Sequence, residues 1–297
     1  MTEHSPAGLD PAAPGRLRAL FRRHGFRPRR RLGQTFLVDG NIVRNLVRAA
    51  ELTGQECVVE VGAGAGAVTR ALTQQARRVI AIELDAALVS MLAEIVGDTA
   101  EIVHGDLLAL RWDDVLGAED RGRCRVVANL PYAITGPALL HLLDGLDWFS
   151  LLVIMVQREV ADRLVALPGN RARGLLTVLV EAACETRIVA RVARTCFYPR
   201  PQVDSTILAL KPRRPGPVPP ELDPTFRRLV KAAFGTRRKM LSNALSHSPA
   251  LAISKEEAVA LLSQCDIDPG RRAEDLSAEE FVGLAEAFAA MPRKGPE

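Results

Sequence analysis

Residues 57–70 read CVVEVGAGAGAVTR. An apolar, strand-type run leads directly into three alternating glycines, and a helix-type segment follows them. Glycine allows the backbone to approach a ligand closely, and the free N–H groups at the start of a helix attract anionic or polar groups. A buried strand, a glycine loop and a helix in this order predict the first unit of a nucleotide-binding α/β fold.

The same alternation continues along the chain. Strand-type runs follow at 78–83, 100–106, 124–129 and 150–156, and helix-type runs lie at 40–51, 67–76, 86–96, 136–143 and 158–167. Short apolar runs separated by helices predict a parallel sheet covered on both faces. Two later β-rich runs, 186–194 and 204–211, predict a closing antiparallel hairpin. We therefore expect an α/β, Rossmann-like sheet.

A proline-rich stretch separates this region from the rest. Residues 211–220 read KPRRPGPVPP, which is typical of a stiff linker. Beyond it only helices are expected, at 223–234, 237–246, 255–263 and 278–289. Residues 1–15 look disordered. The sequence thus predicts a basic, partly disordered arm (1–30), an α/β catalytic domain (31–212) and a small all-helical, RNA-binding domain (213–297).

Composition excludes several classes of protein. The chain is 48% hydrophobic, but no uncharged apolar run reaches the roughly 18 residues of a membrane span. The first residues lack the apolar segment of a secretory signal. The five cysteines contain no C-x-x-C pair, which argues against a disulfide framework and a zinc site. We expect a cytoplasmic protein with no membrane partner.

Positive charge is concentrated in two places. Residues 16–31 contain eight arginines and no acid, although the net charge of the chain is only +4. The second cluster comprises Arg227, Arg228, Lys231, Arg237, Arg238 and Lys239. Basic clusters bind polyanions by releasing counterions from phosphates, so they favour a nucleic acid partner over a merely solvated face.

The glycine loop fits two cofactor templates. As Gly62-x-Gly64-x-x-Ala67 it matches the dinucleotide fingerprint, and as E-x-G-x-G-x-G it matches the first motif of S-adenosylmethionine (SAM) methyltransferases. Glu83 ends the second strand, where it can accept hydrogen bonds from ribose hydroxyls of either cofactor. Asp106 ends the third strand and can accept from the exocyclic amine of an adenine, which favours SAM over a nicotinamide cofactor.

A reactive site is expected where the fourth strand ends, in Asn129-Leu130-Pro131-Tyr132. An exocyclic adenine amine is a poor nucleophile because its lone pair is delocalised into the ring. Acceptors on both N–H groups localise that lone pair, and the Asn129 oxygen and the Leu130 carbonyl are suited to this. Pro131 keeps Leu130 extended, and Tyr132 offers a stacking face worth about 1–3 kcal/mol. The scheme needs neither a titrating base nor a metal.

These motifs resemble the KsgA-type (RsmA) small-subunit ribosomal RNA adenine dimethyltransferases over residues 28–290. The resemblance rests on LGQTFLVD (32–39), EVGAGAG, IELD, HGDLL, NLPY, FYPRPQVDS (197–205) and AFGTRRKMLSNAL (233–245). It implies dimethylation of N6 of two adjacent adenosines in the 3′-terminal hairpin loop of small-subunit (16S) RNA, late in subunit assembly. We expect a monomer that acts on the small ribosomal subunit.

The resemblance also implies a role for each matching residue. The implied cofactor-binding residues are Thr35, Leu37, Gly62, Glu83, Asp106 and Asn129, and the implied RNA-binding residues are Arg237, Arg238 and Lys239. Phe197 would face Tyr132 across the flipped target adenine. Thr35 replaces the asparagine usual in the family, which leaves that side chain's contact open.

Three alternatives remain. A large-subunit methyltransferase of the macrolide-resistance type shares the SAM loop and N-x-P-Y, but FYPRPQVDS and the RRK helix argue against it. A non-enzymatic assembly or transcription factor on this fold would be expected to have lost the glycine loop or NLPY. A nicotinamide oxidoreductase would share the glycine loop and Glu83, and a spectral titration with nicotinamide cofactor would reveal it. The sequence leaves open whether naked RNA or a subunit is the substrate, the order of the four methyl transfers, and the role of the arginine-rich arm.

Overall fold

The computed structural model describes residues 11–29, 33–236 and 238–292. The chain divides into two compact units. The first comprises Met1–Ala161 and Arg187–Lys211, and the second comprises Asp162–Thr186 and Pro212–Glu297. The expected domain boundary at 212/213 therefore falls next to one of these divisions, whereas residues 162–186 group with the helical part.

Among the described residues, the main sheet has seven strands in the order β4-β3-β2-β5-β6-β9-β7. In that order they are β4 (Glu101–His104), β3 (Arg78–Glu83), β2 (Cys57–Val61), β5 (Cys124–Asn129), β6 (Phe149–Gln157), β9 (Ser205–Pro212) and β7 (Cys184–Val192). Strands β2 to β6 pair in parallel, and β9 is antiparallel to β6. The expected Rossmann-like sheet is confirmed, with an antiparallel addition after the parallel strands.

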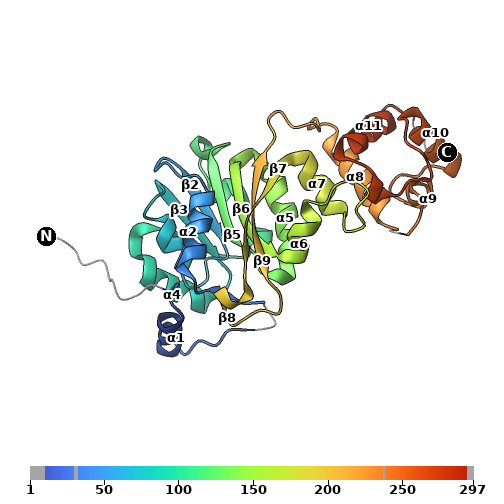
Figure 1. Ribbon diagram of the computed structural model, residues 1–297. Helices are drawn as coiled ribbons and strands as arrows, with labels where there is room; N and C mark the ends of the chain where they lie inside the picture. Colours follow the sequence, from blue (N-terminus) through green and yellow to red (C-terminus); the bar gives the residue numbers. More distant parts are fainter. Residues whose placement is uncertain (1–10, 30–32, 237, 293–297) are drawn as a thin grey trace. The chain divides into compact units, whose positions relative to one another are not determined.

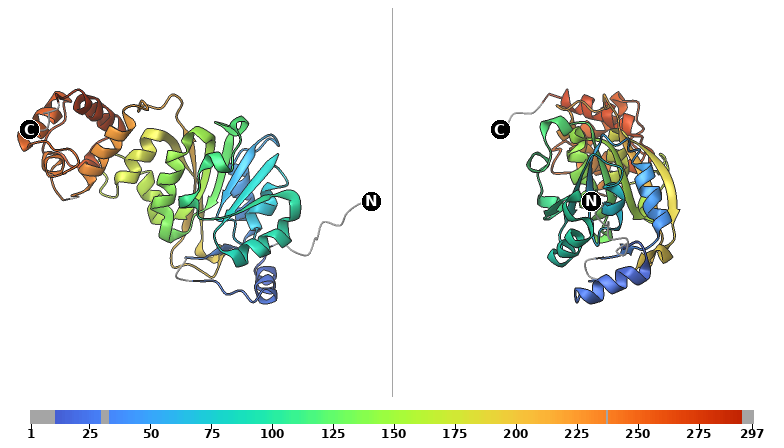
Figure 2. Two further views of the ribbon diagram at one scale, coloured as in Figure 1. Left: turned by 180° about the vertical axis from the view of Figure 1, so that it is seen from behind. Right: turned by 90° about the vertical axis from the view of Figure 1, so that its left-hand side faces the viewer.

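Helices cover both faces of this sheet (Figures 1 and 2). They are α2 (Gly40–Ala49), α3 (Ala67–Leu72), α4 (Ala86–Val96) and α5 (Thr135–Asp144). Helix α2 begins after Asp39, whose carboxylate accepts a hydrogen bond from the Asn41 N–H at 2.8 Å. Apolar residues of α2 and α3 share one core cluster with Val58, Val127 and Val153 of the sheet.

A second, two-stranded sheet was not expected. Strand β1 (Phe36–Leu37) pairs antiparallel with β8 (Phe197–Tyr198), and Leu37 lies opposite Phe197. Two-residue strands carry no periodic signal, so sequence reasoning placed Phe197 in a loop. The pairing joins the LGQTFLVD and FYPRPQVDS motifs.

The arginine-rich arm contains a helix that was also not expected. Helix α1 (Pro14–Arg23) buries Leu17, Leu20 and Phe21. These residues pack in a cluster with Phe36 of β1 and with Leu88, Met91 and Leu92 of α4. The arginines dominate the composition of this segment, and they obscured the helical spacing of Leu17, Leu20 and Phe21. Residues 1–10 and 30–32 of the arm lie outside the described residues.

The second unit is helical. Its helices are α7 (Leu175–Ala183), α8 (Asp223–Phe234), α9 (Leu241–Ser246), α10 (Lys255–Gln264) and α11 (Ala278–Ala289), while α6 (Arg158–Leu164) spans the division between the units. Ser277 and Glu280 form a capping box at the start of α11. Helix α7 was missed by the sequence analysis. No helix of the described residues is long and apolar enough to cross a membrane.

Buried Arg173 explains why residues 162–186 belong to this unit. Its side chain is 1% exposed and donates to the carbonyl oxygens of Ala166, at 2.8 Å, and Leu276, at 3.0 Å. It also forms an ion pair with Glu181 of α7. One guanidinium thus ties the segment before α7 to the segment before α11, and a buried cation satisfied in this way is costly to remove.

Candidate active site

A cavity lies at the carboxyl ends of β2, β3 and β5, the edge at which open α/β sheets bind ligands. All six predicted cofactor-binding residues line it: Thr35, Leu37, Gly62, Glu83, Asp106 and Asn129. Leu130 and Pro131 of the expected reactive stretch also line it. Residues separated by almost a hundred positions therefore meet in one place, as the motifs predict.

The glycine loop needs glycine for its backbone conformation and for space. Gly62, Gly64 and Gly66 have φ angles of 74°, 58° and 82°, which side chains strain. A Cβ at Gly62 would lie 3.4 Å from the carbonyl oxygen of Asn129, and one at Gly66 would lie 3.0 Å from Leu92. The loop therefore approaches the end of β5 closely and leaves the cavity open above it.

Glu83 braces this loop from the end of β3. Its side-chain oxygens accept hydrogen bonds from the Gly64 N–H at 2.8 Å and from the Asp85 N–H at 2.9 Å. Burial raises the pKa of Glu83, and the N–H donors oppose that effect. The carboxylate retains accepting capacity toward the cavity, because each oxygen can accept more than one hydrogen bond.

Glu60 is the first residue of the glycine motif, but it was not predicted from sequence to be a ligand-binding residue. It lines the cavity and is 3% exposed. Burial raises its pKa to about 8, and the neighbouring Glu83 adds to this. Within the described residues its Oε2 has no hydrogen-bond partner. A buried carboxyl group with one unpaired oxygen on a cavity wall is suited to a cationic ligand group.

Protonation of Glu60 leads to a prediction about stability and pH. Its raised pKa means that the folded, ligand-free protein holds a proton that the unfolded chain releases. The free energy of unfolding should therefore fall as pH rises from about 5 to beyond 8. Glu60→Gln should flatten this dependence, as measured by urea unfolding at pH 5.5 and 8.5. An equal fall in wild type and variant would contradict it.

The segment before β1 is fixed over the cavity by polar contacts. The Gln34 side chain donates to the Asp85 carboxylate at 3.0 Å and accepts from the Arg29 N–H at 2.8 Å. Asp85 also caps α4 by accepting from the Ala87 N–H. The Asn129 side chain donates to the Thr35 carbonyl oxygen at 3.4 Å. At position 35 this last contact uses only the backbone carbonyl. Thr35 therefore makes it as well as the asparagine usual in the family would.

The predicted acceptors at the end of β5 are free to act. The Leu130 N–H donates to Met155 of β6 at 3.2 Å, and the Pro131 carbonyl accepts from Ile134 at 3.1 Å. Within the described part of the chain, neither the Asn129 side-chain oxygen nor the Leu130 carbonyl oxygen accepts a hydrogen bond. Two acceptors beside a cavity are what an aminopurine N–H₂ group would need.

Tyr132 and Phe197 lie in different environments. The Tyr132 hydroxyl is hydrogen-bonded to Ser205 at 2.7 Å, and burial raises the pKa of Tyr132. Ser205 ends the FYPRPQVDS motif and was not selected from sequence, although that motif drew attention to it. Phe197 is 4% exposed and packs in a core cluster with Leu37 and Val43. It does not line the cavity, so its predicted role opposite Tyr132 remains a prediction.

Asp106 lies at the strand end expected from sequence, but the helix expected at 237–246 begins only at Leu241. Asp106 is exposed at the end of β4, where it accepts from the Leu108 N–H at 2.9 Å. Arg238 and Lys239 are exposed between α8 and α9. Arg237 lies outside the described residues. Arg227, by contrast, forms an ion pair with Asp223 at 2.7 Å.

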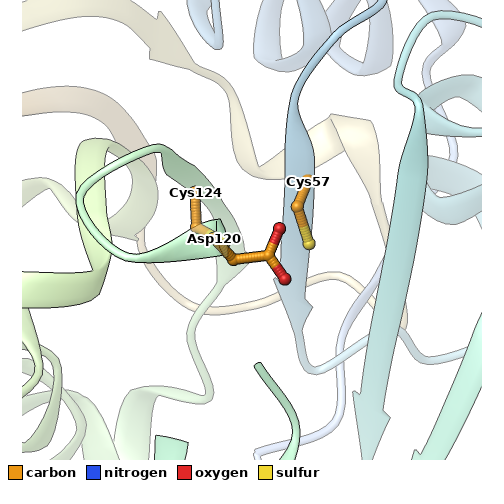
Figure 3. A group of neighbouring side chains, drawn as sticks. All are labelled: Cys57, Asp120 and Cys124. Carbon is orange, nitrogen blue, oxygen red and sulfur yellow. The ribbon is translucent and has the colours of Figure 1, made fainter. Parts of the chain in front are cut away.

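A different cluster lies at the opposite, amino ends of β2 and β5 (Figure 3). Cys57, Asp120 and Cys124 are buried, with ligand atoms within 4.8 Å of one another. The Asp120 oxygens accept from Arg77 at 3.2 Å and Arg78 at 3.0 Å. Two guanidinium groups already neutralise this carboxylate, which disfavours a metal cation there.

Comparisons with known proteins show the family of this chain. The family model described as ribosomal RNA adenine dimethylase matches residues 25–290. Proteins called ribosomal RNA small subunit methyltransferase A from Pelotomaculum thermopropionicum and Moorella thermoacetica are 42% and 44% identical. The alignments cover 93% and 92% of this chain and 97% of each relative.

Two solved structures share the fold. A dimethyladenosine transferase from Plasmodium falciparum matches with a TM-score of 0.71 at 24% identity, over 84% of this chain and 95% of that one. The 23S rRNA methyltransferase ErmE matches with a TM-score of 0.65 at 25% identity, over 86% and 99%. The fold is therefore shared with a dimethyladenosine transferase and with a 23S rRNA methyltransferase, and it does not by itself distinguish between their substrates.

Proposed function

The chain belongs to the ribosomal RNA adenine dimethylase family, and we propose that it dimethylates N6 of two adjacent adenosines in the 3′-terminal hairpin loop of small-subunit rRNA, late in subunit assembly. SAM is the methyl donor. The observation that carries the proposal is the cavity in which the glycine loop and Glu83 meet Asn129 and Leu130.

SAM has a matching group for each part of this cavity. Glu83 accepts from the ribose hydroxyls and Asp106 from the adenine amine, while Gly62 leaves room for the methionine portion. Glu60 is placed to accept the cationic ammonium group, which would return its pKa toward the ordinary value. The segment from Thr35 to Leu37 covers the cofactor.

The target adenine enters from the Asn129 side. Its N6–H₂ group donates to the Asn129 side-chain oxygen and to the Leu130 carbonyl, which localises the nitrogen lone pair. That nitrogen attacks the sulfonium methyl carbon, the carbon–sulfur bond breaks, and S-adenosylhomocysteine (SAH) leaves as a neutral thioether. The cationic product nitrogen then loses its proton to water. Positioning and acceptors aimed at the developing positive charge supply the rate, and we propose that no metal takes part.

Tyr132 supplies the stacking face for the extruded base. Its hydrogen bond to Ser205 fixes the ring at the end of β5, so the ring loses little conformational freedom when the base stacks on it. Phe197 would complete the clamp from β8. We further propose that the enzyme works as a cytoplasmic monomer, with the small ribosomal subunit as its partner.

The direct test uses small ribosomal subunits that lack the modification. The purified protein should transfer labelled methyl groups from SAM to these subunits, with up to four per particle by the proposed reaction. Transfer confined to large-subunit RNA would overturn the proposal in favour of the macrolide-resistance type. The small subunit is favoured here because relatives above 40% identity carry that substrate in their names.

A second prediction concerns RNA binding by the helical unit. Arg238→Ala combined with Lys239→Ala should weaken subunit binding and flatten its salt dependence by about one unit per lost phosphate contact. Lys255→Ala, which removes an exposed cation at the start of α10, should leave the slope unchanged. Binding measured across a salt series distinguishes these outcomes, and an unchanged slope in the double variant would contradict the RNA-contacting role.

A further inference from the structure

Helix α1 contributes to the cofactor cavity, although neither the motifs nor the proposed chemistry gives it a role. Leu17 of this helix and Pro11 just before it line the cavity. Leu17 is 1% exposed. A residue from the arginine-rich arm therefore lines the same cavity as Glu83 and Gly64.

The packing of α1 reaches the glycine loop through one aromatic ring. The Phe21 ring lies 4.9 Å from the ring of Phe36, edge to face. Phe36 itself lines the cavity, and a Cβ at Gly64 would lie 3.3 Å from its ring. The helix, the Phe36 ring and the glycine loop are thus consecutive layers, and displacement of α1 would expose Phe36 and open the cavity.

Side-chain contacts anchor α1 at two sides of the site. Glu94 of α4 pairs with Arg23 and, at 2.7 Å, with His24. The Arg18 guanidinium carbon lies 5.6 Å from the centre of the Tyr198 ring of β8. Helix α4 follows directly from the Glu83 strand end, and β8 is the partner of β1. The helix therefore contacts α4, whose Leu88 lines the cavity, and β8, which pairs with the cavity-lining strand β1.

We propose that α1 is a cofactor-retaining cover and that Leu17 is a cofactor-binding residue. Apolar contact with Leu17 would lower the free energy of the bound state, and closure would slow SAH release. The Arg23–Glu94 ion pair is partly exposed, and such pairs hold weakly. The cover can therefore open, which the reaction requires because each of the four transfers consumes one SAM. This inference rests on the assignment of the cavity to SAM.

The chain offers a matched pair of variants for the test. Leu17 and Leu20 are both buried leucines of α1, at 1% and 4% exposure, but only Leu17 lines the cavity. Leu17→Ala should weaken SAH binding by about fivefold to tenfold and speed its release, whereas Leu20→Ala should change affinity by less than about twofold. Calorimetry and stopped-flow measurements give both quantities, and unfolding curves show whether the variants lose comparable stability.

Hydrogen exchange supplies a readout that is independent of the variants. Thermodynamic coupling between two events is reciprocal. If the packed position of α1 increases the affinity for SAH, then bound SAH must stabilise the packed position of α1 to the same extent. Amides of residues 14–23 should exchange more slowly when SAH is added to the wild-type protein. Unchanged exchange, or equal losses of SAH affinity in both leucine variants, would overturn the proposal that α1 is a cover and would leave the proposed function intact. No SAH binding by the wild type would overturn the cover and the proposed function together.

Discussion

Asn129→Ala should reduce methyl transfer by about two to three orders of magnitude, the loss that follows removal of one charge-stabilising group from an active site. The variant loses the side-chain oxygen that accepts from the target amine. It also loses the donor to the Thr35 carbonyl oxygen, so SAM binding should weaken to a smaller extent. Single-turnover transfer to small subunits at saturating SAM separates the two effects.

Asn129→Asp is the matched control for these two functions. It keeps an acceptor oxygen of nearly the same position but cannot donate to Thr35. If acceptance from the amine carries the rate, the aspartate variant should retain more transfer than the alanine variant at saturating SAM. Subunit binding should be preserved in both. Parallel losses of binding and transfer would instead show that Asn129 has a structural role.

The two free acceptors also constrain the second methylation. After the first transfer the target nitrogen keeps one N–H group, while the Asn129 oxygen and the Leu130 carbonyl remain two acceptors. The monomethylated base must therefore rotate or shift, and its methyl group must fit beside one acceptor. Tyr132 permits this, because a stacking face tolerates in-plane rotation better than a fixed hydrogen bond does. Its tether to Ser205 keeps the ring in place while the base moves.

The features best predicted from sequence are those that depend on a few neighbouring residues. The glycine positions, Glu83 at a strand end and the Asn129–Tyr132 stretch each follow from short-range rules, and Glu83 and Asn129 indeed line one cavity. Contacts between distant segments were beyond such rules. The Leu37–Phe197 pairing joins two-residue strands that have no periodicity.

Two other residues show why burial is harder to predict than position. Leu17 lies among arginines, so its segment was predicted to be a basic, partly disordered arm, and its packing partners became evident only in the structure. Glu60 was visible in the motif, but the burial of its carboxyl group, and the lack of a partner for its Oε2 among the described residues, follow only from the surrounding structure. In both cases burial depends on which distant segments pack against the residue, and the local sequence does not contain that information.

Glu83→Ala should raise the dissociation constant for SAM by about tenfold to a hundredfold, because hydrogen bonds to a charged group contribute about 1.5–3 kcal/mol. The variant loses the ribose acceptor and also leaves the Gly64 N–H without its partner, which loosens the loop. Stability should change far less than affinity, since burial already disfavours this carboxylate, as its raised pKa shows. Calorimetry with SAM and urea unfolding measure the two quantities.

Glu101→Ala is a suitable control for the loss of charge. Glu101 lies on the neighbouring strand β4, is 57% exposed in its side chain and pairs with Arg78 at 2.7 Å, and it does not line the cavity. SAM affinity should be unchanged in this variant. If Glu83→Ala weakened SAM binding only in proportion to a loss of folded protein, the carboxylate would be a support for the glycine loop and not a ligand for ribose. A loss of affinity much larger than the fall in the free energy of unfolding would support direct contact with the ribose, because a loosened loop alone would lower both by comparable amounts.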